Sequence, residues 1–159
     1  ADLARMLDEA TVPASRILVV LEGLYSVWGD VGAVKDLAEV AKARGAIVLV
    51  DEAHGLGLYG EHGRGVTEAQ GADHLVDVIV GTFSKSVGVI GGYCVTSHPA
   101  LKSLRLLARS YMYTASLPPA VVASARTAIG IIRDEPQLRA DLWQKAERVC
   151  ASIRELGYT

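Results

Sequence analysis

Short apolar runs punctuate the first two thirds of the chain, and each has the length of a β-strand. Residues 17–21 (ILVVL) and 46–50 (AIVLV) are continuous apolar runs. Two further runs, residues 78–81 (VIVG) and 91–97 (GGYCVTS), combine β-branched residues with glycine and polar residues. Continuous β-branched runs are typical of strands buried on both faces of a parallel sheet. The pattern therefore predicts four strands at these positions.

Between and after these runs, apolar residues recur every three or four positions, which is typical of amphipathic helices. This spacing predicts helices over residues 2–10, 34 to about 45, 100–108, 118–132 and 137–156, with a helical turn over 67–71. We expect residues 111–115 to form a short strand. Strands that alternate with helices indicate an α/β fold, with three α/β/α layers, a mostly parallel sheet and helices on both faces.

Composition narrows the class of protein. The chain has 159 residues, is 50% hydrophobic and carries a formal net charge of −2, without a basic cluster that would favour nucleic acid. Cys94 and Cys150 have no metal-ligand spacing, so we expect buried thiols in a reducing compartment. No signal peptide or bilayer-spanning run is visible, which predicts a cytoplasmic protein. Because the chain starts at Ala1 and stops just after a predicted helix, we expect a fragment of a longer protein.

Chemically active residues directly follow two of the predicted strands. Asp51 ends the run at 46–50, and His54 comes three residues later. Lys85 follows the run at 78–81 and is surrounded by hydroxyl side chains, those of Thr82, Ser84 and Ser86. In open α/β sheets, ligands bind at the carboxyl ends of the strands. Two plainer alternatives remain at this point: the aspartate caps the next helix, and the lysine is a solvated loop residue.

Glycine is concentrated between residues 55 and 65, where five glycines alternate with Tyr59, His62 and Arg64 among other residues. This segment is too irregular for a linker and too rich in glycine for a helix. We therefore expect an ordered loop over a site or an interface.

Two catalytic interpretations fit these residues. The segment V-D-E-A-H (50–54) resembles the acidic motif of helicase-type ATPases, but the phosphate-binding motif G-x-x-x-x-G-K-[ST] is missing from residues 1–50. Alternatively, the Lys85 amine can form a Schiff base with pyridoxal phosphate. The Asp51 carboxylate can then keep the pyridine nitrogen protonated, and hydroxyls beside the lysine can bind the phosphate.

Five motifs in order support the second interpretation. They are E-G-L-Y-S-V-W-G-D (22–30), L-V-D-E-A-H (49–54), G-R-G-V-T-E-A-Q-G (63–71), G-T-F-S-K-S-V-G with G-G-Y (81–93), and T-A-S-L-P-P (114–119). Together they resemble the α-oxoamine synthases, a branch of the fold-type-I pyridoxal-phosphate enzymes. The serine before Lys85 and the third motif most resemble the serine palmitoyltransferases within that branch.

The resemblance implies a role for each residue near the two strand ends. Lys85 would bind pyridoxal phosphate covalently and act as the catalytic base. Asp51 would pair with the pyridinium nitrogen. His54 and Ser26 would hydrogen-bond the phenolic oxygen of the cofactor.

The resemblance also implies a phosphate site and an oligomeric state. Thr82 and Ser84 would hold the cofactor phosphate. Thr114 and Ser116 lie in the motif that reaches the phosphate of the neighbouring subunit, which implies a homodimer with shared active sites. Residues 1–133 would belong to the cofactor-binding large domain, and residues 134–159 would form a helix leading into a C-terminal small domain.

The implied reaction is the decarboxylating condensation of an amino acid, L-serine, with a long-chain acyl-CoA, palmitoyl-CoA. Its products would be 3-ketodihydrosphingosine, CoA and CO2, and the lipid product implies peripheral contact with a membrane. The alternatives within the branch are 8-amino-7-oxononanoate synthase and 2-amino-3-ketobutyrate CoA ligase. A non-catalytic partner subunit is a third kind of function, which the presence of Lys85 argues against.

Overall fold

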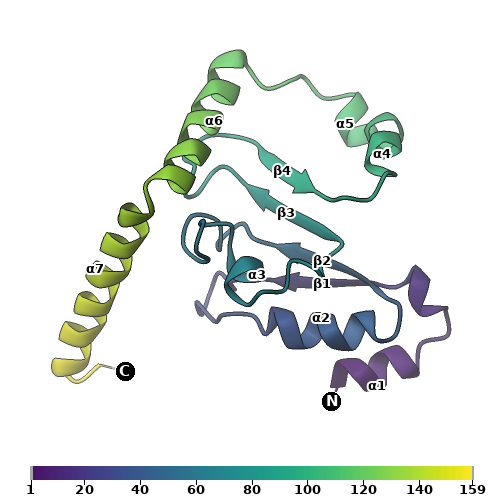
Figure 1. Cartoon of the computed structure of the whole chain (residues 1–159), viewed down its shortest axis with the longest axis horizontal. Coiled ribbons are helices and arrows are strands. Elements are labelled where there is room, and N and C mark those ends of the chain that lie inside the picture. The colour runs from purple at the N-terminus through teal and green to yellow at the C-terminus, as the bar shows by residue number, and fades with distance from the viewer. Residues whose placement is uncertain (1, 159) are drawn as a thin grey trace.

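The computed structural model describes residues 2–158. Four strands form one sheet, in the order β1-β2-β3-β4 (Figure 1). The strands are β1 (Leu18–Glu22), β2 (Ile47–Asp51), β3 (Val78–Thr82) and β4 (Gly92–Val95). Strands β1, β2 and β3 are parallel, and β4 pairs with β3 in the antiparallel direction. The four predicted strands are confirmed, and the sheet is mostly parallel as expected.

The helices begin and end close to the predicted positions. They are α1 (Asp2–Asp8), the 3-10 turn η1 (Ala14–Arg16), α2 (Val34–Lys42), α3 (Val66–Ala69), α4 (Leu101–Leu107), α5 (Arg109–Met112), α6 (Pro119–Asp134) and α7 (Pro136–Glu155). The strand predicted over residues 111–115 is wrong. The amides of Tyr111 and Met112 both donate to the Ala108 carbonyl at 3.0 Å, so local bonds close a helical turn there.

The core lies between the sheet and α2. Val34, Ala38 and Ala41 of α2 are fully buried, at the spacing of one helix face. They belong to one apolar cluster with Val48 and Val50 of β2, which are also fully buried. Figure 1 shows α1 and α2 on this side of the sheet.

The opposite side of β1 and β2 is open. Leu18 and Val20 are 51% and 59% exposed, and Ile47 is 40% exposed. The fold class is confirmed, but burial of these strands on both faces is wrong within residues 2–158, because α1 and α2 pack on one face only. The prediction of buried thiols is also wrong: Cys94 on the edge strand β4 and Cys150 on α7 are both exposed.

Between residues 2 and 158, none of the helices combines the length and the apolar character needed to cross a membrane.

One ion pair fastens α2 to the sheet. The Lys42 ammonium lies 2.8 and 2.9 Å from the two carboxylate oxygens of Asp77, and the Val48 amide donates to the same carboxylate at 2.8 Å. Burial raises the pKa of Asp77, but the bonds from Lys42 and Val48 outweigh it and hold the pKa below its ordinary value of 3.8. The charged form of Asp77 therefore stabilises the fold.

Asp77→Asn should lower the free energy of unfolding by about 1 kcal/mol at neutral pH, a modest value because the pair is one-third exposed. A lowered folded-state pKa gives stability that is present above the unfolded pKa and is lost as the pH falls through the folded value. The difference from wild type should therefore shrink at a pH of about 3, measured by urea unfolding. Asp36→Asn, at an exposed position of α2, is the control and should change little at either pH. An equal loss at both pH values would contradict the role of the charge.

The C-terminal helix α7 packs on the glycine-rich segment. The Trp143 indole donates to the Leu58 carbonyl at 2.9 Å, and its ring meets Tyr59 edge-on at 5.1 Å between centroids. The buried Arg139 donates to the Ile132 carbonyl at 2.8 Å and to the Glu61 carbonyl. The prediction that this segment is an ordered loop is confirmed, and α7 is one of the elements that hold it.

Trp143→Phe removes the indole N–H while keeping a ring against Tyr59. It should destabilise the chain by about 1 kcal/mol, the usual net value of one hydrogen bond. Trp28→Phe makes the same chemical change at a side chain that is 85% exposed, and it should have almost no effect. Urea unfolding followed by circular dichroism distinguishes the two variants, and equal effects would argue against the Trp143 bond.

Candidate active site

The two predicted site residues with opposite charge lie at one edge of the sheet. In the parallel pairing of β2 with β3, Asp51 stands opposite Val80, and the amide of Glu52 donates to the Val80 carbonyl at 2.8 Å. Lys85 lies in the loop that follows β3. The carboxylate therefore stands at the carboxyl end of β2 and the amine on the loop after the neighbouring β3, as the sequence predicts.

Asp51 is held in a fixed orientation. One of its carboxylate oxygens, Oδ1, accepts the amide of Ala53 at 2.8 Å, which closes a short turn after β2. Its second oxygen, Oδ2, accepts no hydrogen bond from residues 2–158. Since the side chain is only half-buried, that oxygen can accept a bond from a ligand.

The Lys85 loop is a compact turn. The Phe83 amide donates to the Gly91 carbonyl at 2.9 Å, and the Gly88 amide donates to the Lys85 carbonyl at 3.0 Å. Gly88 has a φ of +74°, a conformation that side chains with a Cβ rarely adopt. Val87 is buried beneath the turn, whereas Lys85 is exposed and has no acidic partner in the described part of the chain.

Two hydroxyl groups lie together at the start of this turn. Thr82 Oγ1 and Ser84 Oγ are 2.8 Å apart and hydrogen-bonded, and the Ser84 amide donates to Thr82 Oγ1 at 3.2 Å. Thr82 Oγ1 also lies 3.2 Å from the Gly91 carbonyl, to which it can donate. When Thr82 instead donates to Ser84, the Ser84 O–H next to Lys85 is free for a phosphate group.

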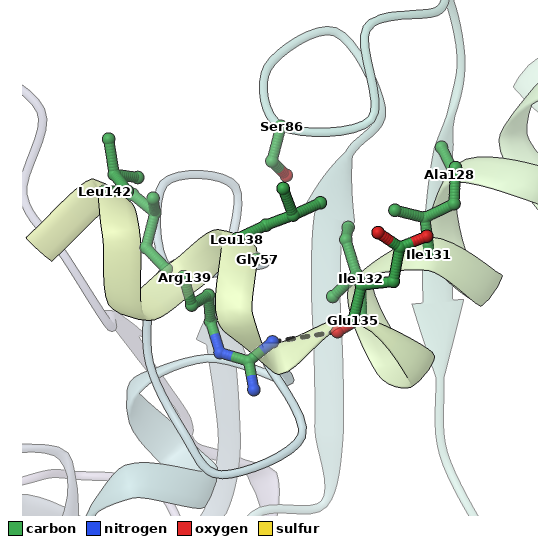
Figure 2. A pocket seen from close by; sticks show the side chains of 10 residues that line it. Gly57, Ser86, Ala128, Ile131, Ile132, Glu135, Leu138, Arg139 and Leu142 are labelled. Carbon is green, nitrogen blue, oxygen red and sulfur yellow. Dashed lines mark hydrogen bonds between the residues drawn. The ribbon is translucent and has the colours of Figure 1, made fainter.

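The glycine loop, residues 55–65, contacts the Lys85 loop at Ser86. A Cβ on Gly57 would lie 3.0 Å from Cβ of Ser86, and Gly57 has a φ of +81°, so the close approach depends on glycine. Figure 2 shows the pocket of about 400 Å³ that these loops form with α6 and α7. Its lining is mostly apolar: Gly57, Leu58, Ser86, Ala128, Ile131, Ile132, Glu135, Leu138, Arg139 and Leu142.

Four other residues were predicted to bind the cofactor: His54, Ser26, Thr114 and Ser116. His54 is half-buried and Ser26 is exposed in the loop after β1, and neither side chain makes a hydrogen bond to Asp51 or Lys85. Thr114 and Ser116 are exposed in the segment between α5 and α6. Their assignments to the cofactor stay predictions.

Two carboxylates that hold the glycine loop were missed by sequence reasoning. Glu52 is fully buried, and the side chain of Glu68 is 8% exposed. Glu68 accepts bonds from the His62 ring at 2.7 Å and from the Arg64 guanidinium at 3.0 Å. Burial raises the pKa of Glu68, but the bonds from Arg64 and His62 lower it below its ordinary value. The spacing of Arg64 and Glu68, four residues apart at a helix start, was a signal for this pair.

The comparisons with known proteins agree with this fold. Residues 1–159 match the family described as aminotransferase class I and II. The chain is 49% identical over 141 residues to serine palmitoyltransferase of Sphingomonas paucimobilis, covering 89% of this chain and 34% of that protein. It is 36% identical over 157 residues to 8-amino-7-oxononanoate synthase of Symbiobacterium thermophilum, covering 99% of this chain and 40% of that protein.

A solved structure has the same fold. A lysine-to-alanine variant of serine palmitoyltransferase from S. paucimobilis, with a bound PLP–myriocin aldimine, matches with a TM-score of 0.92 and 45% identity. The match covers 99% of this chain and 39% of that one. The chain thus spans 34–40% of the length of these relatives.

These matches confirm the resemblance to α-oxoamine synthases. The family match also includes the D-E-A-H segment. The interpretation of this segment as an ATPase motif is therefore not needed. Fold and sequence agree, and the chain belongs to the aminotransferase class I and II family.

Proposed function

We propose that this chain is the lysine-bearing part of a pyridoxal-phosphate-dependent α-oxoamine synthase. The observation that carries the proposal is the pairing of β2 with β3, which sets Asp51 opposite Val80 and leaves the Lys85 amine on the next loop. A carboxylate and a free amine on adjacent strand ends match the two ends of a pyridoxal ring. The names of the relatives support the same class of enzyme.

The residues present fit this cofactor. Asp51 has one carboxylate oxygen without a partner in residues 2–158, suited to a protonated ring nitrogen. Lys85 is exposed and makes no ion pair among the described residues. When Thr82 donates to Ser84, the Ser84 O–H can donate to a phosphate. His54 and Ser26 are assigned to the phenolic oxygen by resemblance.

Each residue has a distinct task in the reaction. Bound pyridoxal phosphate supplies an electron sink for negative charge at the Cα of the amino acid. Lys85 would hold the cofactor covalently, and its amine, when free, would accept the Cα proton of the amino acid. Asp51 keeps the proton on the ring nitrogen through its negative charge. Thr82 and Ser84 would hold the phosphate of the cofactor and so keep its ring in a fixed position.

Serine palmitoyltransferase is the activity that we favour within this class. Two serine palmitoyltransferases are 49% and 45% identical to this chain, whereas two 8-amino-7-oxononanoate synthases are 36% identical. The substrates would be L-serine and palmitoyl-CoA, and the products 3-ketodihydrosphingosine, CoA and CO2. CoA release by the full-length enzyme, measured with each small amino acid in turn, distinguishes this activity from that of the other α-oxoamine synthases.

The assembly and the domain division complete the proposal. A homodimer is the expected form, in which the exposed Thr114 and Ser116 serve the phosphate of the neighbouring subunit. Residues 1–133 would belong to the large domain. Helix α7, which starts at Pro136, would lead into the small domain.

Lys85→Ala in the full-length enzyme should abolish covalent attachment of pyridoxal phosphate and lower turnover by at least about 10³-fold. Borohydride reduction followed by peptide mapping measures the attachment, and CoA release measures turnover. Lys102→Ala, at an exposed lysine of α4, is the matched control and should keep both. A label on another lysine in the wild-type enzyme would refute the assignment.

Asp51→Asn should lower kcat by about 10²-fold or more while the circular dichroism spectrum stays the same. The amide oxygen of asparagine can still accept the Ala53 amide, so the turn is kept and only the charge is lost. Steady-state kinetics with saturating L-serine give the readout. A kcat within a few-fold of wild type would mean that Asp51 does not pair with the ring nitrogen.

A further inference from the structure

Glu52 is a buried carboxylate to which the proposed mechanism gives no task. Its relative exposure is 0%, and it is the largest fully buried side chain in the described part of the protein. Its amide continues the ladder of β2 by donating to the Val80 carbonyl at 2.8 Å. Because side chains alternate along an extended chain, Glu52 and its neighbour Asp51 point to opposite sides of the sheet.

The carboxylate of Glu52 accepts three short hydrogen bonds. The Val66 amide donates to Oε2 at 3.0 Å, and the Thr67 amide and hydroxyl both donate to Oε1 at 2.6 Å. Neutral groups supply all three bonds, and no lysine, arginine or histidine among residues 2–158 forms an ion pair with Glu52. A buried carboxylate of this kind strongly destabilises the folded protein once any of its hydrogen-bond donors is lost.

Three glycines surround this carboxylate, one after β1 and two at the ends of the glycine loop. A Cβ on Gly23, Gly55 or Gly65 would overlap atoms of the Glu52 carboxylate. Gly23 follows β1 and leads into the loop of Ser26, Gly55 follows His54, and Gly65 precedes α3. The glycines therefore let the chain after β1 and both ends of the glycine loop approach one buried group.

The backbone around Glu52 is tied to the same segments. The Glu52 carbonyl accepts the amides of Gly55 at 3.1 Å and Leu56 at 2.9 Å, which fixes the turn that contains His54. The Gly23 amide donates to the Asp51 carbonyl at 2.9 Å. The Tyr93 phenol also faces this region: burial, followed by the charges of Glu52 and Asp51, raises its pKa.

We infer that Glu52 is a positioning residue for the cofactor site. Its carboxylate bonds the segment that carries Asp51 and His54 to the start of α3, and Gly23, which leads into the loop of Ser26, packs against it. Glu52 thereby sets the position of the groups assigned to the pyridoxal ring. This inference rests on the proposed function, since it concerns how those groups meet pyridoxal phosphate. The residue itself touches neither cofactor nor substrate.

The test uses the full-length holoenzyme and Glu52→Gln. The side chain keeps its size, but its NH2 group must face an amide or hydroxyl donor of Val66 or Thr67. The dissociation constant for pyridoxal 5′-phosphate should rise at least about tenfold. The pH midpoint of the visible absorbance of the lysine-bound cofactor should also move by about half a unit or more, because Asp51 and His54 are displaced.

Glu68→Gln is the matched control. It makes the same chemical change at a second nearly buried carboxylate of the glycine loop, one whose partners are His62 and Arg64. We expect a comparable loss of thermal stability in both variants. The cofactor dissociation constant and the pH midpoint should stay within about twofold and about 0.2 unit of wild type only in Glu68→Gln.

A milder variant covers the case in which Glu52→Gln does not fold. Thr67→Val removes the hydroxyl donor and leaves both amide bonds, and it should raise the dissociation constant about threefold. Unchanged cofactor binding and pH midpoint in the folded variants would overturn the positioning role, as would equal shifts in the Glu68→Gln control. A wild-type enzyme that binds no pyridoxal phosphate would overturn the proposed function, and this inference with it.

Discussion

Parallel pairing of β2 with β3 sets Asp51 opposite Val80, and the geometry of the candidate site follows from that register. A slip of one residue would exchange the two faces of β2. Val48 and Val50, now fully buried against α2, would be exposed, and Asp51 would enter the apolar side. The free energy of core burial, about 2 kcal/mol for each valine, thus also maintains the position of the carboxylate. The hydrogen bonds that pair β2 with β3 thus fix both the burial of the valines and the position of Asp51.

The strands could be predicted because β2 and β3 are apolar runs of the right length, and α2 because Val34, Ala38 and Ala41 repeat on one face. Polar residues at the ends of parallel strands share an edge, so the juxtaposition of Asp51 and Lys85 also followed. An apolar run does not reveal which of its faces is covered, and so the exposure of Val20 could not be foreseen. The burial of Glu52 depends on partners 14 and 15 residues away in sequence, a distance that no local pattern covers.

The glycine loop owes its order to polar contacts rather than to apolar packing alone. Glu52 is bonded to Val66 and Thr67 at one end of the loop, and Glu68 bonds the stretch around His62 and Arg64. Helix α7 adds two donors, from Trp143 and Arg139, to carbonyls of the same loop. A glycine-rich segment loses much conformational entropy on ordering, and these bonds offset that loss. The order of the glycine loop thus depends on contacts with elements on both sides of it in the sequence.

The order of the sheet has a consequence for how the protein acquires its structure. Each strand pairs with the strand that follows it in the chain, so β1, β2, β3 and β4 are neighbours in sequence and in space. In the two parallel pairings the partner residues lie 29 positions apart in the chain, so each closure spans one crossover connection. During synthesis, β2 can pair with β1 once β2 itself has emerged after α2, and β3 can then add to an existing template. The edge that brings Asp51 and Lys85 together is thus assembled one strand at a time, in the order of translation.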